Sequence, residues 1–176
     1  MYRRVSWMLS LAGAAMMVWP RPVAAQAHTS VGFAVGATIP TGAYGSDKNV
    51  GYHAGPSLHV PIGALPVELR IDGNFTEMKY SGNSTKAQIW AASGNLLARM
   101  PTGTVITPYV VGGFGIYNAH RSLSLRNSAV TKLGANAGGG LRLALHDVAL
   151  FLEARYHRAG GTDGIQMVPI TLGVMF

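Results

Sequence analysis

The chain has 176 residues, of which only 12% are charged, and it carries a formal net charge of +7. A soluble domain normally covers itself with about 25–35% charged residues, so part of this exterior must contact something other than water. The lack of cysteine excludes disulfides, thiolate metal sites and a lipid-modified cysteine.

The first 27 residues have the pattern of a secretory signal peptide. Arg3 and Arg4 precede the apolar run Val5–Val18, and a small-x-small cleavage motif ends at Ala27. The run of roughly 14 apolar residues is shorter than the ~20 that a transmembrane helix needs. We predict cleavage after Ala27 or, as the alternative, after Ala25. Removal of the segment takes away three arginines and lowers the net charge from +7 to +4.

Eight later segments have the composition and the period-two pattern of β-strands, and each is bounded by Gly, Pro, Asn, Asp or Ser. No later segment reaches the roughly 18 apolar residues of a transmembrane helix. The strand segments are approximately Ser30–Ile39, Val50–Ile62, Val67–Tyr80, Ala87–Met100, Val105–Ala119, Thr131–Leu145, Val148–Gly160 and Ile165–Phe176.

The links between these segments alternate in character. Tight turns at 63–66, 101–104 and 146–147 alternate with more polar and, on average, longer links at 40–49, 81–86, 121–130 and 161–164. Short turns at one end and longer loops at the other are typical of an up-and-down membrane barrel with both termini in the periplasm. The segments are also long enough for the ~9–11 residues of a tilted membrane strand.

Two features depart from this pattern. The segment Ala87–Met100 alternates poorly and is also compatible with a helix at Ala91–Leu97. Proline removes a donor from a strand ladder, so we expect the strand prolines at rims or bulges. These are Pro56, Pro61, Pro108 and Pro169.

Charged residues share one face of three segments, opposite apolar residues. Charges withdrawn from bulk water are tolerated when they are paired, and an eight-stranded barrel has an interior just wide enough for side chains. We therefore predict a charge-balanced network that plugs the lumen, with a narrow pore for small solutes as the alternative. Its members are Glu68, Arg70, Asp72, Lys132, Arg142, Glu153 and Arg155.

The opposite orientation, a soluble barrel of lipocalin type, would put the apolar face inside. Its solvent-facing surface would then consist mainly of glycines and a few charges, which is a poor coat in water. The membrane orientation is favoured. It directs to lipid or to the membrane interfaces Phe33, Tyr52, Phe75, Trp90, Leu152, Tyr156, Leu172 and Phe176.

The last segment alternates strictly, with Val168, Ile170, Leu172 and Val174 on the same face as the terminal Phe176. This ending resembles the closing strand of the small bacterial outer-membrane β-barrel proteins. Three internal segments also resemble recurrent strand motifs of that family: Pro108–Gly115, Asn136–Arg142 and Phe151–His157.

The resemblance spans 28–176 and implies an all-β fold, an eight-stranded antiparallel up-and-down transmembrane β-barrel in the outer membrane. It implies that Phe176 helps the barrel insertion machinery to recognise the chain. It implies a location and a fold rather than a reaction. We therefore expect a non-enzymatic, monomeric envelope protein in contact with outer-membrane lipids, with no cofactor and no nucleic-acid partner.

Basic residues outnumber acids in and next to the predicted outer loops. Guanidinium and ammonium groups both bind phosphates, so they are candidates for contacting lipopolysaccharide. Simple solvation of the loops is the alternative. The residues are Lys48, Lys79, Lys86, Arg121, Arg126 and Arg158.

The competing enzyme hypothesis is a lipid A deacylase, a barrel of similar size in which a His-x-Ser pair activates the serine. His120 and Ser122 have that spacing and share a strand face. The residue that follows Ser122 is Leu123, where the resemblance would require Asn. The histidines predict no metal site, because His53 and His59 are about 20 Å apart on one strand.

Overall fold

The computed structural model describes residues 28–82, 85–123, 126–161 and 164–176; for 121–123 and 126–128 only the backbone is described. The predicted signal peptide, residues 1–27, lies outside the described residues. One short helix, α1 (Gly42–Gly45), follows the first of eight strands. The strands are β1 (Ser30–Pro40), β2 (Gly51–Pro61), β3 (Val67–Lys79), β4 (Lys86–Arg99), β5 (Ile106–Leu123), β6 (Arg126–Ala144), β7 (Ala149–Ala159) and β8 (Ile165–Met175).

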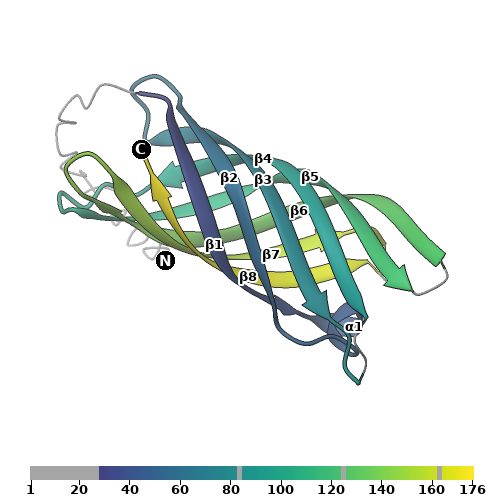
Figure 1. The fold of residues 1–176 in the computed structure, drawn as a ribbon. Coiled ribbons are helices and arrows are strands. Elements are labelled where there is room, and N and C mark those ends of the chain that lie inside the picture. Colours follow the sequence, from purple (N-terminus) through teal and green to yellow (C-terminus); the bar gives the residue numbers. More distant parts are fainter. Residues whose placement is uncertain (1–27, 83–84, 124–125, 162–163) are drawn as a thin grey trace, which may run out of the picture.

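Each strand pairs antiparallel with its neighbours in sequence, and β1 pairs with β8 to close the sheet (Figure 1). The predicted fold class, an eight-stranded up-and-down β-barrel, is confirmed. Closure leaves no sheet edge along the barrel wall. In the part of the chain that the structure describes, no helix is long and apolar enough to cross a membrane.

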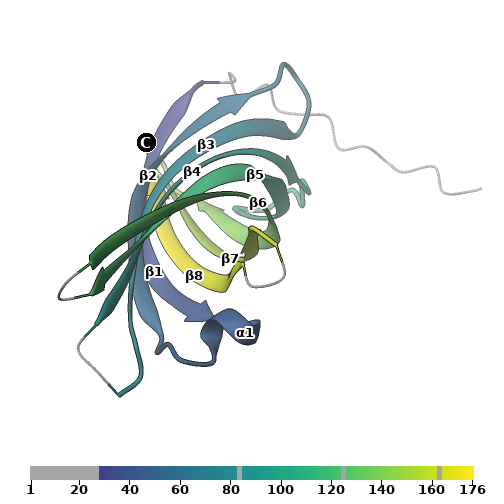
Figure 2. The same cartoon turned by 90° about the vertical axis from the view of Figure 1, so that its right-hand side faces the viewer.

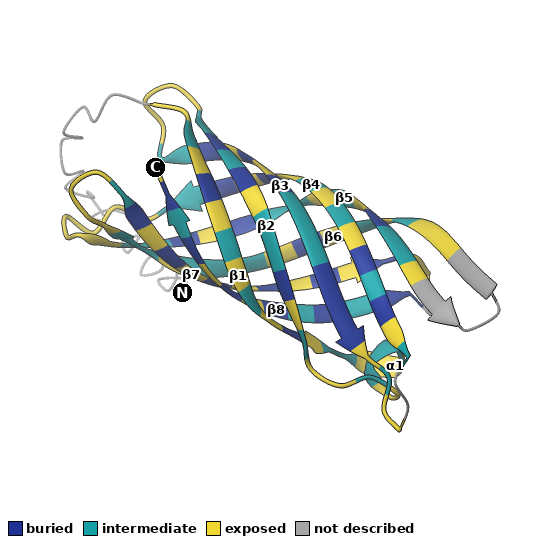
Figure 3. Ribbon diagram, viewed as in Figure 1, coloured by how far each residue is buried: buried dark blue, intermediate teal, exposed yellow. Residues whose placement is uncertain are grey.

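Side chains alternate between the lumen and the exterior, as the strand pattern predicts (Figure 3). In β8, Met167 and Met175 point inward and are buried, whereas Leu172 is 56% exposed on the outside. Trp90 on β4 is 58% exposed and contacts Phe75 of β3, with ring centroids 4.7 Å apart. A continuous apolar exterior of this kind fits lipid rather than water.

The two ends of the barrel differ. The turn end holds the short links between β2 and β3, β4 and β5, and β6 and β7, together with Phe176, whose N–H donates to the Val31 carbonyl at 2.9 Å. The loop end holds the other links and α1, which lies beside β8 (Figures 1 and 2).

The structure corrects the expected loop at 121–130. β5 and β6 continue through most of it and pair from His120↔Ala129 to Leu123↔Arg126. Ser, Arg and Asn are frequent in this segment and resemble a loop sequence, although most of them lie in paired strands. Residues 86–99 form the regular strand β4, so a helix at Ala91–Leu97 is excluded.

Two of the four strand prolines are not at rims or bulges. Pro56 and Pro169 lie inside β2 and β8, and the ladder is interrupted beside each of them. The register is the same on both sides of Pro56, with Ala54↔Phe75 and Ser57↔Asp72. A bulge would have shifted it by one residue. Each proline therefore removes local pairing without changing the register.

Candidate functional site in the barrel lumen

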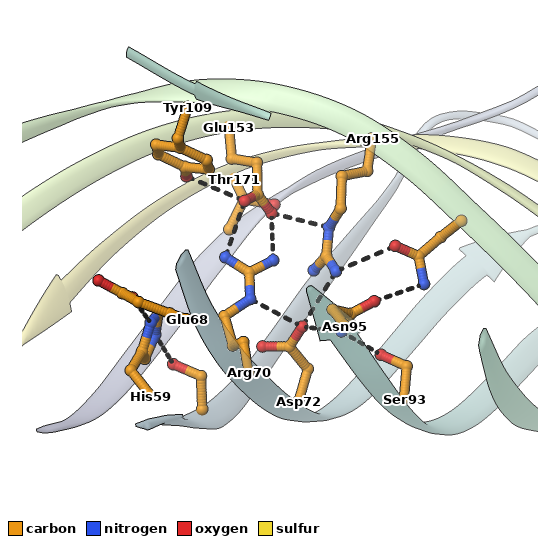
Figure 4. A network of polar contacts seen from close by, with 12 residues as sticks. His59, Glu68, Arg70, Asp72, Ser93, Asn95, Tyr109, Glu153, Arg155 and Thr171 are labelled. Carbon is orange, nitrogen blue, oxygen red and sulfur yellow. Dashed lines mark hydrogen bonds and ion pairs between the residues drawn. The ribbon is translucent and has the colours of Figure 1, made fainter. Parts of the chain in front are cut away.

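A ring of four charged side chains lies at the centre of the lumen (Figure 4). Arg70 of β3 donates from both terminal nitrogens to Glu153 of β7, at 2.8 and 2.9 Å. Its Nε donates to Asp72 Oδ2 at 3.1 Å. Arg70 is 1% exposed, so all of its charge is neutralised inside the protein.

Arg155 of β7 completes the ring. Its Nη1 donates to Asp72 Oδ2 at 3.0 Å, and its Nε lies 2.7 Å from Glu153 Oε1. Each carboxylate therefore contacts both guanidinium groups. Asn95 donates to Asp72 at 2.9 Å, and the Tyr109 hydroxyl donates to Glu153 at 2.9 Å. These neutral donors fill positions that would otherwise remain unsatisfied in a low-dielectric site.

A second polar group lies nearer the turn end. Glu68 Oε1 is 3.1 Å from Arg99 Nε and 3.2 Å from Arg142 Nη1. Its Oε2 is 3.3 Å from His59 Nδ1, and His59 Nε2 is 3.1 Å from the Ser57 hydroxyl. Ser57, His59 and Glu68 thus have the connectivity of a catalytic triad. The void that Ser57 lines has a volume of about 20 Å³, which is room for one water and not for an acyl substrate.

Two apolar layers bracket the polar centre. The layer at the loop end consists of Met78, Ile89, Tyr117, Ala159, Ile165 and Met167, with Tyr44 of α1 packed against it. The layer at the turn end consists of Leu97, Tyr109, Val111, Ala149, Phe151 and Met175. The sequence interpretation did not include these layers, because inward and outward positions are both apolar near the strand ends.

The predicted lumen residues do not all lie in one network. Glu68, Arg70, Asp72, Arg142, Glu153 and Arg155 form the two groups described above. Lys132 lies apart from them, opposite Tyr117, and its aliphatic chain runs beside Gly160. No ion pair of Lys132 occurs among the described residues. The interpretation missed Arg99 and Asn95, although they share a face of β4 at period two, because the small residues of β4 obscure its alternation.

The basic residues at the loop end have different surroundings. Lys48 donates to the Tyr44 carbonyl at 2.9 Å and to Asp47 at 2.6 Å, and its Nζ lies 4.2 Å from the centre of the Tyr44 ring. Its side chain is 7% exposed, so it does not face outward. It holds together the first loop, the link 41–50 between β1 and β2. Burial raises the pKa of Tyr44 in the same loop.

Lys79 and Lys86 lie directly opposite each other on β3 and β4, on the outer face. Lys86 contacts Glu77 at 2.8 Å, whereas no ion pair of Lys79 occurs among the described residues. Arg158 at the end of β7 is exposed. The side chains of Arg121 and Arg126 lie outside the described residues.

The His120–Ser122 pair lies at the loop end of β5. His120 is exposed and its neighbours across the sheet are Gln88 and Ala129. The Ser122 side chain lies outside the described residues; its backbone pairs with Asn127. No Asp or Glu occurs between Glu77 and Asp147 in the sequence. The strands flanking the pair therefore offer no adjacent carboxylate to orient the imidazole.

A closed antiparallel barrel with an apolar exterior and paired charges inside defines an integral membrane protein of β-barrel type. The chain belongs to the outer membrane protein beta-barrel domain family, whose sequence profile matches residues 8–176. Membership places the protein in the outer membrane. A sequence comparison with curated proteins finds no match.

Solved structures share the fold at low sequence identity. Neisserial surface protein A is 19% identical, with a TM-score of 0.66, over 84% of this chain and 94% of that one. The N-terminal barrel domain of Pseudomonas aeruginosa OprF is 18% identical, with a TM-score of 0.57, over 84% and 97%. The outer membrane enzyme PagL is 16% identical, with a TM-score of 0.55, over 84% and 98%.

Proposed function

We propose that this protein is a non-enzymatic outer-membrane barrel with a closed lumen, which serves the envelope in a structural or surface-contact role. The observation that supports this proposal is the filling of the interior. A neutralised ring of four charges is bracketed by two apolar layers, and the void beside Ser57 is about 20 Å³. A solute would have to displace buried ion pairs to pass.

Planar-bilayer recording tests the closed lumen. We expect no stable conductance from the folded wild-type protein. Replacing Arg70 and Glu153 together by Ala removes the ion pair that spans the lumen and should allow small, fluctuating currents. The matched control is Leu172→Ala, which shortens a side chain on the outer face and should stay silent. Stable wild-type currents at the level of an open porin would establish the narrow pore instead.

At the outer rim the proposed partner is the phosphate of lipopolysaccharide. Lys79 and Lys86 support this contact, because Glu77 neutralises only one of these opposed charges. They stand about 13 Å along the strands beyond the Phe75–Trp90 pair, where an aromatic belt would give way to headgroups. The exposed Arg158 is a third candidate. Lys48 is not, because its ammonium group binds Asp47 and Tyr44 within its own loop. Solvation of the loops is the alternative.

The competing function is lipid A modification by His120 and Ser122. One observation favours keeping it as the second candidate: His120 is exposed, and the backbone of residue 122 continues the same strand. Mass spectrometry of lipid A from cells with and without the protein separates the two functions. We expect identical profiles. Loss of an acyl chain that disappears in Ser122→Ala would replace the structural role by an enzymatic one.

A further inference from the structure

The hairpin of β5 and β6 leaves a free strand edge at the loop end. β6 begins at Arg126, but its pairing with β7 starts only at Gly134↔Ala159. On its other side, β6 is paired with β5 along its whole length. The hairpin therefore reaches beyond its neighbours, as Figures 1 and 2 show. Among the described residues, the side of β6 that faces away from β5 has no partner strand before Leu133.

The backbone groups on this open side can be assigned. In antiparallel strands the N–H and C=O of one residue point to the same side, and successive residues alternate. The Leu133 carbonyl accepts a hydrogen bond from the Gly160 N–H at 2.9 Å, so the backbone N–H and C=O of Leu133 point toward the β7 side. The backbone groups of Thr131 and Ala129 point the same way and pair with no strand among 28–82, 85–123, 126–161 and 164–176. They present two donors and two acceptors with the spacing of a sheet ladder.

No strand in the described part of the chain pairs with this edge. β7 ends at Ala159, and the chain turns at Gly160, which has a φ of +83°. A Cβ placed on Gly161 would meet no atom within 4 Å. A strand added next to Ala129 and Thr131 would continue the sheet above the end of β7. The described part of the edge has no proline and no bulge, which are two of the devices that protect exposed edges.

The charge of the hairpin indicates the chemistry of the partner. β5 and β6 contain no Asp or Glu, and Lys132 and the exposed Arg158 flank the open edge. Antiparallel pairing with a second copy, centred on Ala129, would put the basic positions 126 and 132 opposite each other. Like charges placed directly opposite across strands are destabilising. An extended segment with acidic side chains would instead bring carboxylates close to Lys132 and Arg158, where the attraction is favourable.

We propose that the open edge of β6 at Ala129 and Thr131 binds an extended acidic segment of another protein by taking it up as an additional strand. Backbone hydrogen bonds supply the attachment in this mode of recognition. The flanking basic residues select for acidic side chains. The interaction surface lies outside the barrel wall, so binding leaves the lumen unchanged.

The test uses the folded full barrel in detergent and a soluble capped peptide in which Thr and Val alternate with Glu. Amide hydrogen exchange on the wild-type protein should slow at Ala129 and Thr131 when the peptide is added. Val130, whose N–H points toward β5, should not change. No protection at Thr131 with peptide at millimolar concentration, or equal protection along the hairpin, would overturn the proposal.

A pair of variants gives a second readout. Ala129→Pro removes one donor on the open side and leaves the bonds to β5, so it should weaken peptide binding about tenfold. Ala129→Val keeps the donor and should bind as the wild type does. Circular dichroism and heat modifiability check that both variants fold. Equal affinity of the Pro and Val variants would rule out pairing at this edge, as would equal binding of a peptide with Lys in place of Glu.

Discussion

Arg70 and Glu153 form a bidentate ion pair across the full width of the lumen. Their strands, β3 and β7, are four positions apart in either direction around the eight-stranded barrel and are therefore opposite walls. The two N–O distances are 2.8 and 2.9 Å, and both side chains are almost fully buried. One pair thus ties together the two halves of the barrel.

Removing one member of this pair should destabilise the barrel strongly. Arg70→Met leaves Glu153 and Asp72 with one guanidinium between them, and an uncompensated buried charge costs about 3–5 kcal/mol. Equilibrium unfolding in urea from lipid vesicles measures the loss. The control Arg158→Met removes an exposed arginine and should change stability by less than about 0.5 kcal/mol. A similar small change for Arg70→Met would mean that water enters the ring and solvates the carboxylates.

The sequence contains enough to predict which strand faces are charged but not which residues meet. Glu68, Arg70 and Asp72 share a face because strand side chains alternate. Their partners depend on which walls are opposite: Arg70 meets Glu153 on β7, whereas Glu68 meets Arg99 on β4 and Arg142 on β6. Alternation within one strand carries no information on that choice.

The apolar layers and the long hairpin could not be predicted from the sequence, for related reasons. Phe151 and Met175 face inward, but an apolar side chain suits both the lipid face and a packed interior, so polarity does not separate the two. The sequence from His120 to Val130 contains three serines, two arginines and an asparagine, which are typical of a loop. Its strand structure follows from cross-strand pairing with the other half of the hairpin.

Phe176 should matter for insertion more than for the stability of the finished barrel. Phe176 is 63% exposed at the turn end, and its N–H donates to the Val31 carbonyl, so most of its surface does not pack against the barrel. Deleting it should lower the yield of protein in the outer membrane. Refolding of the purified variant into detergent should proceed as for the wild type. An unchanged outer-membrane yield would remove the proposed role of the terminal aromatic.

Tyr44 predicts a loss of loop stability at alkaline pH. Burial raises its pKa in the folded protein above the ordinary value of about 10. Below pH ~10 the phenol is neutral in both states and its contribution to stability is complete. Above that pH the unfolded loop releases the proton more readily, so stability falls as the pH rises. Limited proteolysis of the first loop between neutral and alkaline pH measures this. Tyr44→Phe should abolish the pH dependence, and an unchanged slope in that variant would assign it to another group.

Lys48 and the pair Lys79 and Lys86 should differ in what they affect. The ammonium group of Lys48 is enclosed by Tyr44, Tyr80 and Asp47. Lys48→Gln should therefore speed proteolysis of the first loop and leave binding of lipopolysaccharide unchanged. Lys79→Gln combined with Lys86→Gln should weaken that binding and reduce its salt dependence, because exposed charges act through screened attraction.

Binding to lipopolysaccharide-containing vesicles at low and high salt compares the two cases, with dephosphorylated lipid A as the ligand control. The double variant should bind intact and dephosphorylated lipid almost equally, whereas the wild type should prefer the phosphorylated form. Equal preference in wild type and double variant would assign these lysines to solvation alone. A loss of binding in Lys48→Gln with an intact first loop would show that Lys48, and not the pair Lys79 and Lys86, contacts the lipid.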